Sequence, residues 1–577
     1  MDQETKLLAG VVAFSVILFV TVSAVGAAFV FGIGPVDDDQ EREPPGPDPA
    51  FSPTTFEEVA ADRGFVYEYV EGEIHGGMIS LTTDAGVYVV DFNDNGRDDV
   101  LAIGGEEPVL FENVGGEFLE SDALPELDTS ANGALFFDHD NDGYEDLLLL
   151  PPGSEPIFLE NQEGEFVVRE AGFDVTLSNP TGATAADFTG DGCLDVFVVQ
   201  NGDWDETRPV GTAERGVGDD DNGNPNHLFY GDCSYFERAD ETAITDDRWT
   251  LAVASADLSG NGHPDVYEAN DFNYDVLYEN RGDGTFERHR MDRSDRNAMS
   301  ATVADVTGTG ELDVFVTNIY FDHHVRSELP ITQGTAGRTD GNNLFVNLGD
   351  GAFEDRASAF GVREGGWGWA AAIADYNNDG ELSIVHTTSP IGVDRALQDR
   401  LGMSEGQLYY NYPYLRYPMM FERASETRFR TVQPPDRGFE EGGGRGIVTL
   451  DLDGDGSLDL AVADTRTPYK LYENQGAAGN WLRVDVRGDG EHTELGAEVY
   501  VETDDRTLYD VKHANSDFLS QEPRVLHFGV GDAERVDLRV VWPDGTERTF
   551  ENVAIDRHVR VTPDGELEDR TDAIDGG

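Results

Sequence analysis

Lysine is almost absent from this chain, and basic residues of any kind are few. Lysine occurs only at Lys6, Lys470 and Lys512, and 39 basic residues face 115 acidic ones, which gives a formal net charge of −76. A surface this acidic repels phosphate groups, so nucleic acid is excluded as a partner. Dense carboxylates with little lysine are typical of proteins from extreme halophiles, where concentrated salt screens the repulsion between charges.

Cysteine is nearly absent too, with Cys193 and Cys233 as the two copies. Both fall within one unit of the repeat described below, so the sequence allows a disulfide and equally allows two free thiols. Two cysteines alone do not define the redox compartment. The sequence also lacks a nucleophile elbow, a phosphate loop, a zinc motif and a dinucleotide fingerprint. We therefore expect no catalytic residues and no enzymatic activity.

One nine-residue pattern recurs seven times along the chain. It reads D-x-[DNST]-x-[DNT]-G-x-x-D, with one departure at the ninth position of the sixth copy, and it begins at Asp91, Asp138, Asp187, Asp257, Asp305, Asp375 and Asp451. Each copy lies between apolar, β-branched runs, such as Gly86–Val90 before the first copy and Val100–Ile103 after it, so each copy joins two strands. The recurrence predicts a repeat architecture.

The residue types at positions 1, 3, 5 and 9 predict a calcium site in each loop. Ca²⁺ takes six to eight oxygen ligands, and the glycine at position 6 allows the tight turn that brings these oxygens together. An EF-hand would need a glutamate at position 12 and flanking helices, and neither is present. An acidic β-turn without metal is the alternative that the pattern leaves open. The candidate ligands are Asp91, Asn93, Asn95, Asp99, Asp138, Asp140, Asp142, Asp146, Asp187, Thr189, Asp191, Asp195, Asp257, Ser259, Asn261, Asp265, Asp305, Thr307, Thr309, Asp313, Asp375, Asn377, Asp379, Asp451, Asp453, Asp455 and Asp459.

The loops differ in the calcium affinity that we expect. The second and seventh loops carry four carboxylates each among their candidate ligands, and they should bind best. Thr307 and Thr309 lower the charge of the fifth loop, and Ser383 replaces the closing aspartate of the sixth. The chain therefore offers up to seven Ca²⁺ sites, of which the fifth and sixth are the weakest.

Each loop is followed by two further strand signals. An aromatic segment of the LFEN type begins at Leu110, Phe158, Leu228, Leu277, Leu344, Leu408 and Leu471. A phenylalanine that opens another strand follows at Phe118, Phe166, Phe236, Phe286, Phe353 and Phe421. Four antiparallel strands make one propeller blade. The seventh unit lacks its last strand, and an orphan strand at Phe56–Val59 precedes the first unit, so we expect the N-terminal strand to complete the last blade.

The sequence thus predicts an all-β fold with a seven-bladed β-propeller over residues 51–478. Three insertions, near residues 202–225, 320–341 and 389–406, all lie between the second and third strands of a blade. They therefore share the face opposite the calcium loops. Long loops on a rigid scaffold often carry recognition, and tolerated surface decoration is the alternative.

The loops resemble FG-GAP/VCBS repeats, the blades of integrin-α-type propellers. Phe56-Glu-Glu-Val-Ala60 and Gly366-Trp-Gly-Trp369 resemble the cartilage acidic protein family. From Asn480 the chain reads NWLRVDVRGDG, followed by LGAEVYVE, SDFLSQ and LHFGVG, which is similar to an ASPIC/UnbV domain. The resemblance implies a small β-domain over residues 479–565, which leaves an acidic, disordered tail at 566–577. It implies an architecture and little about activity.

The N-terminal segment is the longest apolar run of the sequence. Residues 7–33 carry no charge. The length of this run exceeds the ~20 residues needed to cross a bilayer and the ~7–15 residues of a signal-peptide core. We predict a transmembrane signal-anchor over 1–36 and an acidic, proline-rich linker over 37–50, although small residues near Ala24 leave cleavage open. Because calcium loops suit a calcium-rich exterior, we expect a single-pass cell-membrane protein with its bulk outside the cell.

These features favour a binding or scaffold protein that recognises an unidentified extracellular protein or glycan through the face carrying the insertions. Two alternatives stay open. One is an extracytoplasmic propeller enzyme acting on a polysaccharide or an alcohol, and the other is a purely structural envelope component.

Overall fold

The computed structural model describes residues 54–571, except 71–84, 203, 206–207, 210–222, 240–243, 245–246, 295–296, 322–339, 350, 390–403, 405–411, 413, 415, 426, 489–492 and 516. The predicted anchor, the linker and most of the three insertions lie outside the described residues. Within the described part, no helix has the length and apolar character needed to cross a bilayer. The regular secondary structure of this part is almost entirely β, with one short α-helix, α5 (Ala357–Phe360), and one 3-10 turn, η4 (Pro434–Arg437).

Seven antiparallel sheets among the described residues share one up-and-down plan of four strands. Six of them are continuous in the chain. The first sheet contains β2 (Gly86–Val90), β3 (Asp99–Ile103), β4 (Val109–Val114) and β5 (Glu117–Glu120), the second contains β6 (Ala134–Phe137), β7 (Asp146–Leu149), β8 (Ile157–Gln162) and β9 (Glu165–Arg169), and the third contains β10 (Pro180–Ala186), β11 (Asp195–Gln200), β14 (His227–Gly231) and β15 (Phe236–Arg238). The fourth contains β16 (Trp249–Ala256), β17 (Asp265–Asp271), β18 (Val276–Asn280) and β19 (Phe286–Arg290), the fifth contains β20 (Thr302–Ala304), β21 (Asp313–Val316), β22 (Asn343–Asn347) and β23 (Phe353–Asp355), and the sixth contains β24 (Gly368–Ala374), β25 (Ser383–Thr388), β26 (Met419–Ser425) and β27 (Arg428–Val432). The first two strands of each sheet flank one of the seven loops.

The seventh sheet joins the two ends of this array. It contains β28 (Gly444–Leu450), β29 (Asp459–Asp464) and β30 (Lys470–Asn474), and its fourth strand is β1 (Phe56–Glu58), which pairs antiparallel with β30 from Phe56↔Asn474 to Glu58↔Tyr472. The N-terminal strand β1 therefore supplies the fourth strand of the last sheet. The first strand of each sheet contacts the first strand of the next, and β28 contacts β2, so the order of the sheets is circular.

The third strand of the sixth sheet differs from the prediction. The aromatic segment was expected at residues 408–411, but β26 pairs with β25 at Ile384↔Phe421, and Phe421 therefore lies in the third strand. The fourth strand is β27, which contains Phe429. The prediction was wrong because the insertion in this unit is longer, and because the segment Met420-Phe421-Glu422-Arg423 ends in arginine where the other units carry asparagine or glycine.

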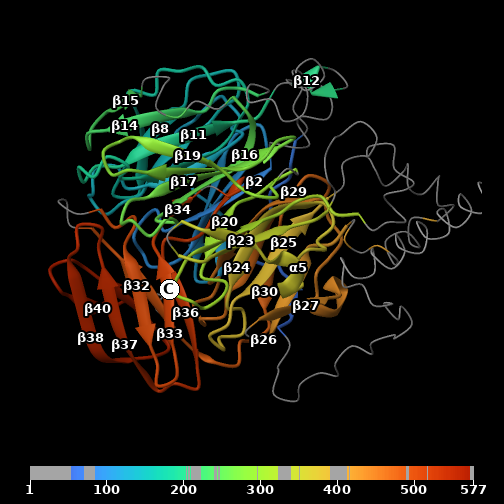
Figure 1. Cartoon of the computed structure of the whole chain (residues 1–577), viewed down its shortest axis with the longest axis vertical. Helices are drawn as coiled ribbons and strands as arrows, with labels where there is room; N and C mark the ends of the chain where they lie inside the picture. The colour runs from blue at the N-terminus through green and yellow to red at the C-terminus, as the bar shows by residue number, and fades with distance from the viewer. Residues whose placement is uncertain are drawn as a thin grey trace, which may run out of the picture. The chain divides into compact units, whose positions relative to one another are not determined.

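The C-terminal part forms two further four-stranded sheets, drawn in orange and red in Figure 1. One consists of β36 (Leu526–Gly531), β31 (Asn480–Val486), β39 (Arg557–Val561) and β40 (Leu567–Asp569). The other consists of β33 (Thr507–Val511), β32 (Glu498–Glu502), β37 (Arg535–Val541) and β38 (Glu547–Ala554). Their facing sides share a core that includes Leu482, Leu538 and Trp542, and we refer to these two sheets as the C-terminal domain.

A segment of the C-terminal domain, residues 514–522, enters the set of seven sheets, and we refer to it as the hub segment. Its strand β34 (Ala514–Asn515) pairs with β10, and its strand β35 (Ser520–Gln521) pairs in parallel with β2. The Oδ1 atom of Asn515 accepts a hydrogen bond of 2.7 Å from the backbone N–H of Ser255 in β16. Gln521 exchanges two hydrogen bonds of 2.8 Å with the backbone of Phe136 in β6.

Two carboxylates of the hub segment bond to the remaining three sheets. Asp517 accepts hydrogen bonds from the N–H of Ala301 (2.9 Å) and the hydroxyl of Thr302 (2.8 Å) at β20, and from the N–H of Ala371 (3.3 Å) in β24. Glu522 accepts one of 2.9 Å from the N–H of Thr449 in β28. One short segment thus bonds at the first strand of every sheet, so these seven strands surround it.

Candidate metal loops

The seven loops share one backbone conformation, which the aspartate at position 1 holds. In every loop this carboxylate accepts a hydrogen bond from the N–H of the position-6 glycine, over 2.6–3.2 Å. In six loops the oxygen at position 5 accepts another from the N–H of position 7, over 2.7–3.0 Å. In the fifth loop, Thr309 bonds instead to the hydroxyl of Thr307 at 3.2 Å. Positions 1 and 5 thus face the inside of one tight turn.

Three carboxylates converge in the second and in the seventh loop. Oxygen atoms of Asp138, Asp140 and Asp142 lie within 4.8 Å of one another, and so do those of Asp451, Asp453 and Asp455. In the first loop, Oδ2 of Asp99 is buried and has no hydrogen-bond partner among the described residues. Converging carboxylates, as in the second and seventh loops, and an unsatisfied buried carboxylate oxygen, as in the first, are donors that suit a hard divalent cation. The residues present therefore fit Ca²⁺.

The aspartate at position 9 bonds to the third strand of its own sheet, a contact that the sequence did not indicate. One of its oxygens accepts a hydrogen bond of 2.7–2.9 Å from the backbone N–H at a fixed place in the third strand, as in Asp146 with Asn161 and Asp459 with Asn474. In the sixth loop the hydroxyl of Ser383 takes this place and accepts from the N–H of Arg423 at 3.2 Å. Position 9 thus fastens each loop to its own sheet.

Burial raises the pKa of the loop carboxyls. The pKa of Asp138 is raised to about 8 by burial and then by Glu494, and that of Asp375 to about 7 by burial and then by Asp379. Burial also raises the pKa of Asp91 and of Asp451 to about 7, although Arg487 and Arg483 respectively oppose the rise. A bound cation would remove the cost of ionising these groups.

A recurring asparagine at the end of the LFEN segment joins neighbouring loops. The side-chain amide of Asn161 donates to the carbonyl of Glu145 (3.1 Å) in its own loop and to that of Phe92 (2.9 Å) in the preceding loop. The same two bonds recur at Asn113, Asn280, Asn347 and Asn474. Asn113 reaches Leu452 of the seventh loop, which closes the circle of loops. The signal in the sequence was the fixed asparagine at the end of the LFEN segment.

The third and sixth sheets lack this asparagine and use other bonds. In the third sheet the residue is Gly231, where an added Cβ would lie 2.1 Å from the carbonyl oxygen of Leu194. There a disulfide links Cys193, at position 7 of the loop, to Cys233, with a Cα–Cα distance of 5.0 Å. In the sixth sheet the Arg423 guanidinium donates to the carbonyl of Val306 in the preceding loop. The two cysteines are therefore paired.

Removing the disulfide should destabilise the third sheet. The bridge spans a sequence separation of 40, and the entropy of closing such a loop predicts a loss of about 4 kcal/mol in the free energy of unfolding for Cys193→Ser with Cys233→Ser. Urea unfolding followed by tryptophan fluorescence measures this loss. Reduction of the wild-type protein should reproduce it, and an unchanged midpoint in both experiments would contradict the prediction.

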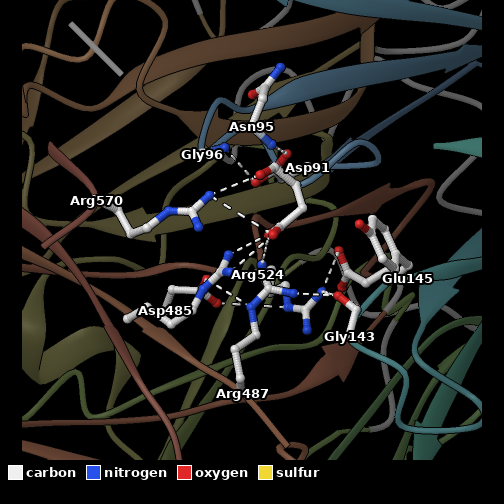
Figure 2. A network of polar contacts seen from close by, with 12 residues as sticks. Asp91, Asn95, Gly96, Gly143, Glu145, Asp485, Arg487, Arg524 and Arg570 are labelled. Atoms are coloured by element: carbon white, nitrogen blue, oxygen red, sulfur yellow. Dashed lines mark hydrogen bonds and ion pairs between the residues drawn. The ribbon is translucent and has the colours of Figure 1, made fainter. Parts of the chain in front are cut away.

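An ionic network joins the C-terminal domain to the loops (Figure 2). Asp485 of β31 accepts hydrogen bonds of 2.8 Å from the guanidinium groups of Arg487 and Arg560, and Arg487 also bonds to Asp94 of the first loop at 2.6 Å. Burial raises the pKa of Asp485, but Arg487, Arg560 and Arg524 outweigh it and hold this pKa well below its usual range. Asp485 is therefore ionised, and the network is a set of charged partners.

A cavity of about 500 Å³ lies between the C-terminal domain and the fifth and sixth loops. Its walls include Asp510, Lys512 and Glu522. Burial raises the pKa of Asp510 and of Glu522 to about 7, and burial followed by Arg524 lowers the pKa of Lys512 to about 7. Titratable groups with shifted pKa values in a cavity are a feature of enzyme sites and also of buried ionic networks.

Comparison with known proteins agrees with this architecture. The FG-GAP-like repeat family matches residues 91–149, 138–198, 257–316 and 334–386, and the ASPIC and UnbV family matches 488–568. Cartilage acidic protein 1 of Homo sapiens is 24% identical over 432 residues, which cover 64% of this chain and 60% of the relative. The same protein of Xenopus tropicalis is 26% identical over 342 residues, which cover 51% of each chain. The matches thus span about half the length of these relatives.

Among solved structures, "YCF48 bound to D1 peptide" aligns with 70% of this chain and 97% of its own, at 9% identity and a TM-score of 0.37. The FG-GAP-like matches include six of the seven predicted loops, and the ASPIC and UnbV match overlaps the predicted C-terminal domain. The chain therefore consists of FG-GAP-like repeats followed by a C-terminal ASPIC/UnbV domain, and it is related at low identity to cartilage acidic protein 1.

Proposed function

We propose that this chain is a calcium-binding, membrane-anchored, extracellular binding or scaffold protein built on a seven-bladed β-propeller. The proposal of seven blades rests on the seven sheets of one plan, on their circular order and on the hub segment that their first strands surround. A closed ring leaves few sheet edges exposed, which suits a rigid platform for recognition.

The observation that supports calcium binding best is the sevenfold recurrence of one loop conformation with oxygen donors on its inside. Side chains at positions 1, 3 and 5 would hold the ion, with the position-7 carbonyl as a further donor. Bound Ca²⁺ would neutralise the carboxylates and would link the first strand of each sheet to the second. The ion is structural in this proposal, and it stiffens the scaffold.

Recognition would fall on the face opposite the calcium loops. The C-terminal domain lies against the first, second, sixth and seventh loops. The three insertions leave from the opposite ends of the strands, between β11 and β14, β21 and β22, and β25 and β26. That face carries the longest connections, so we propose that an extracellular protein or glycan binds there. A glycan and surface-protein binding screen in high salt, with calcium and with chelator, tests this assignment.

The membrane anchor is proposed from the uncharged residues 7–33. In the proposal this segment crosses the membrane once, and the acidic, proline-rich residues 37–50 separate it from the ring. Fractionation of cells into membrane and soluble extracts tests the anchor. Recovery of an intact chain in the soluble extract would contradict it.

An enzyme is the second candidate, because the cavity beside the fifth and sixth loops holds Asp510, Lys512 and Glu522. Turnover of a polysaccharide or an alcohol that is lost in Asp510→Asn, with the thermal midpoint unchanged, would favour this candidate. Binding without turnover would favour the scaffold.

Calcium should stabilise the protein more at pH 8 than at pH 5.5. Without a cation, the folded-state pKa of Asp138, Asp375 and Asp451 lies at about 7–8, above its usual value. A group whose pKa is raised on folding stabilises the fold below its unfolded pKa, and this contribution is lost as the pH rises through the folded value. The apo protein should therefore weaken as the pH rises from the usual aspartate pKa of 3.8 to the folded value of about 7–8, and calcium replaces the protons over this range.

Differential scanning calorimetry with calcium and with chelator at both pH values measures this difference. An equal shift of the midpoint at pH 5.5 and pH 8 would contradict proton displacement. No shift at either pH would contradict calcium binding itself.

A further inference from the structure

We infer that the C-terminal domain and calcium stabilise one another through four of the seven loops. This inference rests on the proposed calcium binding and adds to it a coupling between metal and domain. The loops divide into a docked class, which is the first, second, sixth and seventh, and an open class, which is the third, fourth and fifth.

The burial of the position-1 aspartate separates the two classes. In the docked class, Asp91, Asp138, Asp375 and Asp451 are buried, with at most 8% of each residue exposed. In the open class, Asp187, Asp257 and Asp305 are half-buried. All seven side chains accept the same hydrogen bond from the position-6 glycine, so the difference comes from what lies against each loop.

Arginines of the C-terminal domain hold the first and seventh loops. Arg483 of β31 donates to Asp98 at 2.7 Å and to Asp451 at 3.2 Å, and only 1% of its side chain is exposed. Asp98 also accepts a hydrogen bond of 2.8 Å from the N–H of Asp451, so these two loops are joined directly. Arg487 and Arg560 both bond to Asp94, at position 4 of the first loop.

The second and sixth loops are held through carbonyl and amide oxygens. Arg524 donates to the carbonyl of Gly143 at 3.1 Å, and its Nη1 lies 4.0 Å from a carboxylate oxygen of Glu145. Arg506 donates to the carbonyl of Gly380 at 3.1 Å. Asn378 bonds through its Oδ1 to the ring of His527 at 2.7 Å, and its carbonyl accepts from the N–H of Gly531 at 2.8 Å.

The loop sequences follow this division in part, because the seventh loop is docked but has the glycine and leucine of the open loops. Position 4 has a positive φ in each loop where it is recorded, and glycine fills it in the third, fourth, fifth and seventh loops, at φ +67° to +80°. Asp94, Asn141 and Asn378 occupy this position in the other three docked loops, at φ +54° to +58°, where a side chain costs conformational energy. Position 8 is acidic only in the first two loops, as Asp98 and Glu145, and it is leucine or proline elsewhere.

The docking contacts therefore use mainly positions 4, 6 and 8, together with the Glu381 side chain at position 7 of the sixth loop, and they leave the side chains at positions 3 and 5 for the ion. Position 1 is shared in one case, since Asp451 bonds to Arg483 through the oxygen that also accepts from Gly456. The domain thus fixes the conformation that calcium needs without replacing the ion. If docking raises calcium affinity, calcium must strengthen docking by the same factor.

The test compares hydrogen exchange of the full-length protein with calcium and with chelator. Chelation should raise exchange in β31 and β39 of the C-terminal domain by about tenfold or more, a typical coupling factor. The variant Asp94→Gly with Asn378→Gly keeps a backbone that tolerates φ > 0 and removes the docking side chains. In this variant, calorimetric titration should show weaker calcium binding at a subset of sites and unchanged binding at the rest.

The matched control is Asn552→Gly, which makes the same kind of change at an exposed residue with φ +58° away from the loops. It should behave as the wild type in both experiments. Calcium binding with unchanged exchange in β31 and β39 would overturn the coupling alone. Absence of calcium binding in the wild-type titration would overturn the proposed function, and the coupling with it. The wild-type comparison decides the matter even if the double variant does not fold.

Discussion

Replacing Asp517 by alanine should lower the free energy of unfolding by about 3–6 kcal/mol. Its carboxylate accepts hydrogen bonds from the N–H groups of Ala301 and Ala371 and from the hydroxyl of Thr302, at the first strands of two sheets. All three donors would lose this acceptor where water cannot easily replace it, and each unsatisfied buried donor costs about 1–3 kcal/mol. The loss in the free energy of unfolding is large because this one side chain accepts hydrogen bonds from two sheets.

Urea unfolding of the full chain in high salt measures this loss. Asp517→Asn keeps one acceptor oxygen and should fall between the alanine variant and the wild type. Asp504→Ala, at an exposed residue of the same domain, should leave the midpoint unchanged. If Asp517→Ala unfolds at the wild-type midpoint, the hub segment does not hold the sheets together as the structure indicates.

Replacing Arg483 by methionine should cost about 3–5 kcal/mol. This guanidinium is the charged partner of Asp98 and Asp451, and all three side chains are nearly inaccessible to solvent. Removal of one member of a buried ion pair leaves uncompensated charge in a medium that solvates it poorly, which is the origin of the cost. Methionine keeps most of the side-chain volume of arginine. The loss in the free energy of unfolding therefore comes from the removed charge and not from a cavity.

The matched control is Arg281→Met, because Arg281 also pairs with two carboxylates, Glu279 and Glu287, but lies 43% exposed at the surface. Exposed ion pairs contribute at most about 1 kcal/mol. Thermal and urea unfolding of both variants measure the difference. Equal losses in the two variants would show that the ion pairs between the first and seventh loops stabilise the protein no more than an exposed ion pair does.

Much of the fold could be predicted from the sequence because its signals are local and repeated. Each loop carries its own turn glycine and its own flanking apolar strands, and the orphan strand at Phe56 pairs with β30 as expected. The third strand of the sixth sheet could not be placed, since Arg423 replaces the asparagine that marks the end of this strand in five other units. A position defined by one residue type is lost when that residue changes.

The hub segment could not be predicted, because its partners lie far away in the chain. The motif SDFLSQ has the appearance of a strand within the C-terminal domain, yet Asn515 and Asp517 bond to sheets more than 140 residues earlier. Nothing in the local pattern of hydrophobicity indicates such pairing. Tertiary placement, unlike strand formation, depends on the closure of the whole ring.

The sequence predicted the candidate metal ligands, but it did not predict the contacts that hold the loops in place. Positions 1, 3 and 5 were identified from their oxygen chemistry, whereas the aspartate at position 9 also anchors the third strand. The side chains at positions 4 and 8 were overlooked, although Asp94, Asn378 and Asp98 depart from the glycine and leucine of other loops. Deviations between copies of a repeat were the signal for the docked domain.

The number of calcium ions bound per chain tests the central claim most directly. Equilibrium dialysis of the purified protein in high salt, followed by elemental analysis, measures this number. We predict about five to seven ions per chain, with the fifth and sixth loops as the weakest sites, since Ca²⁺ requires several oxygen donors from each loop. A protein that retains no calcium under these conditions would contradict the account.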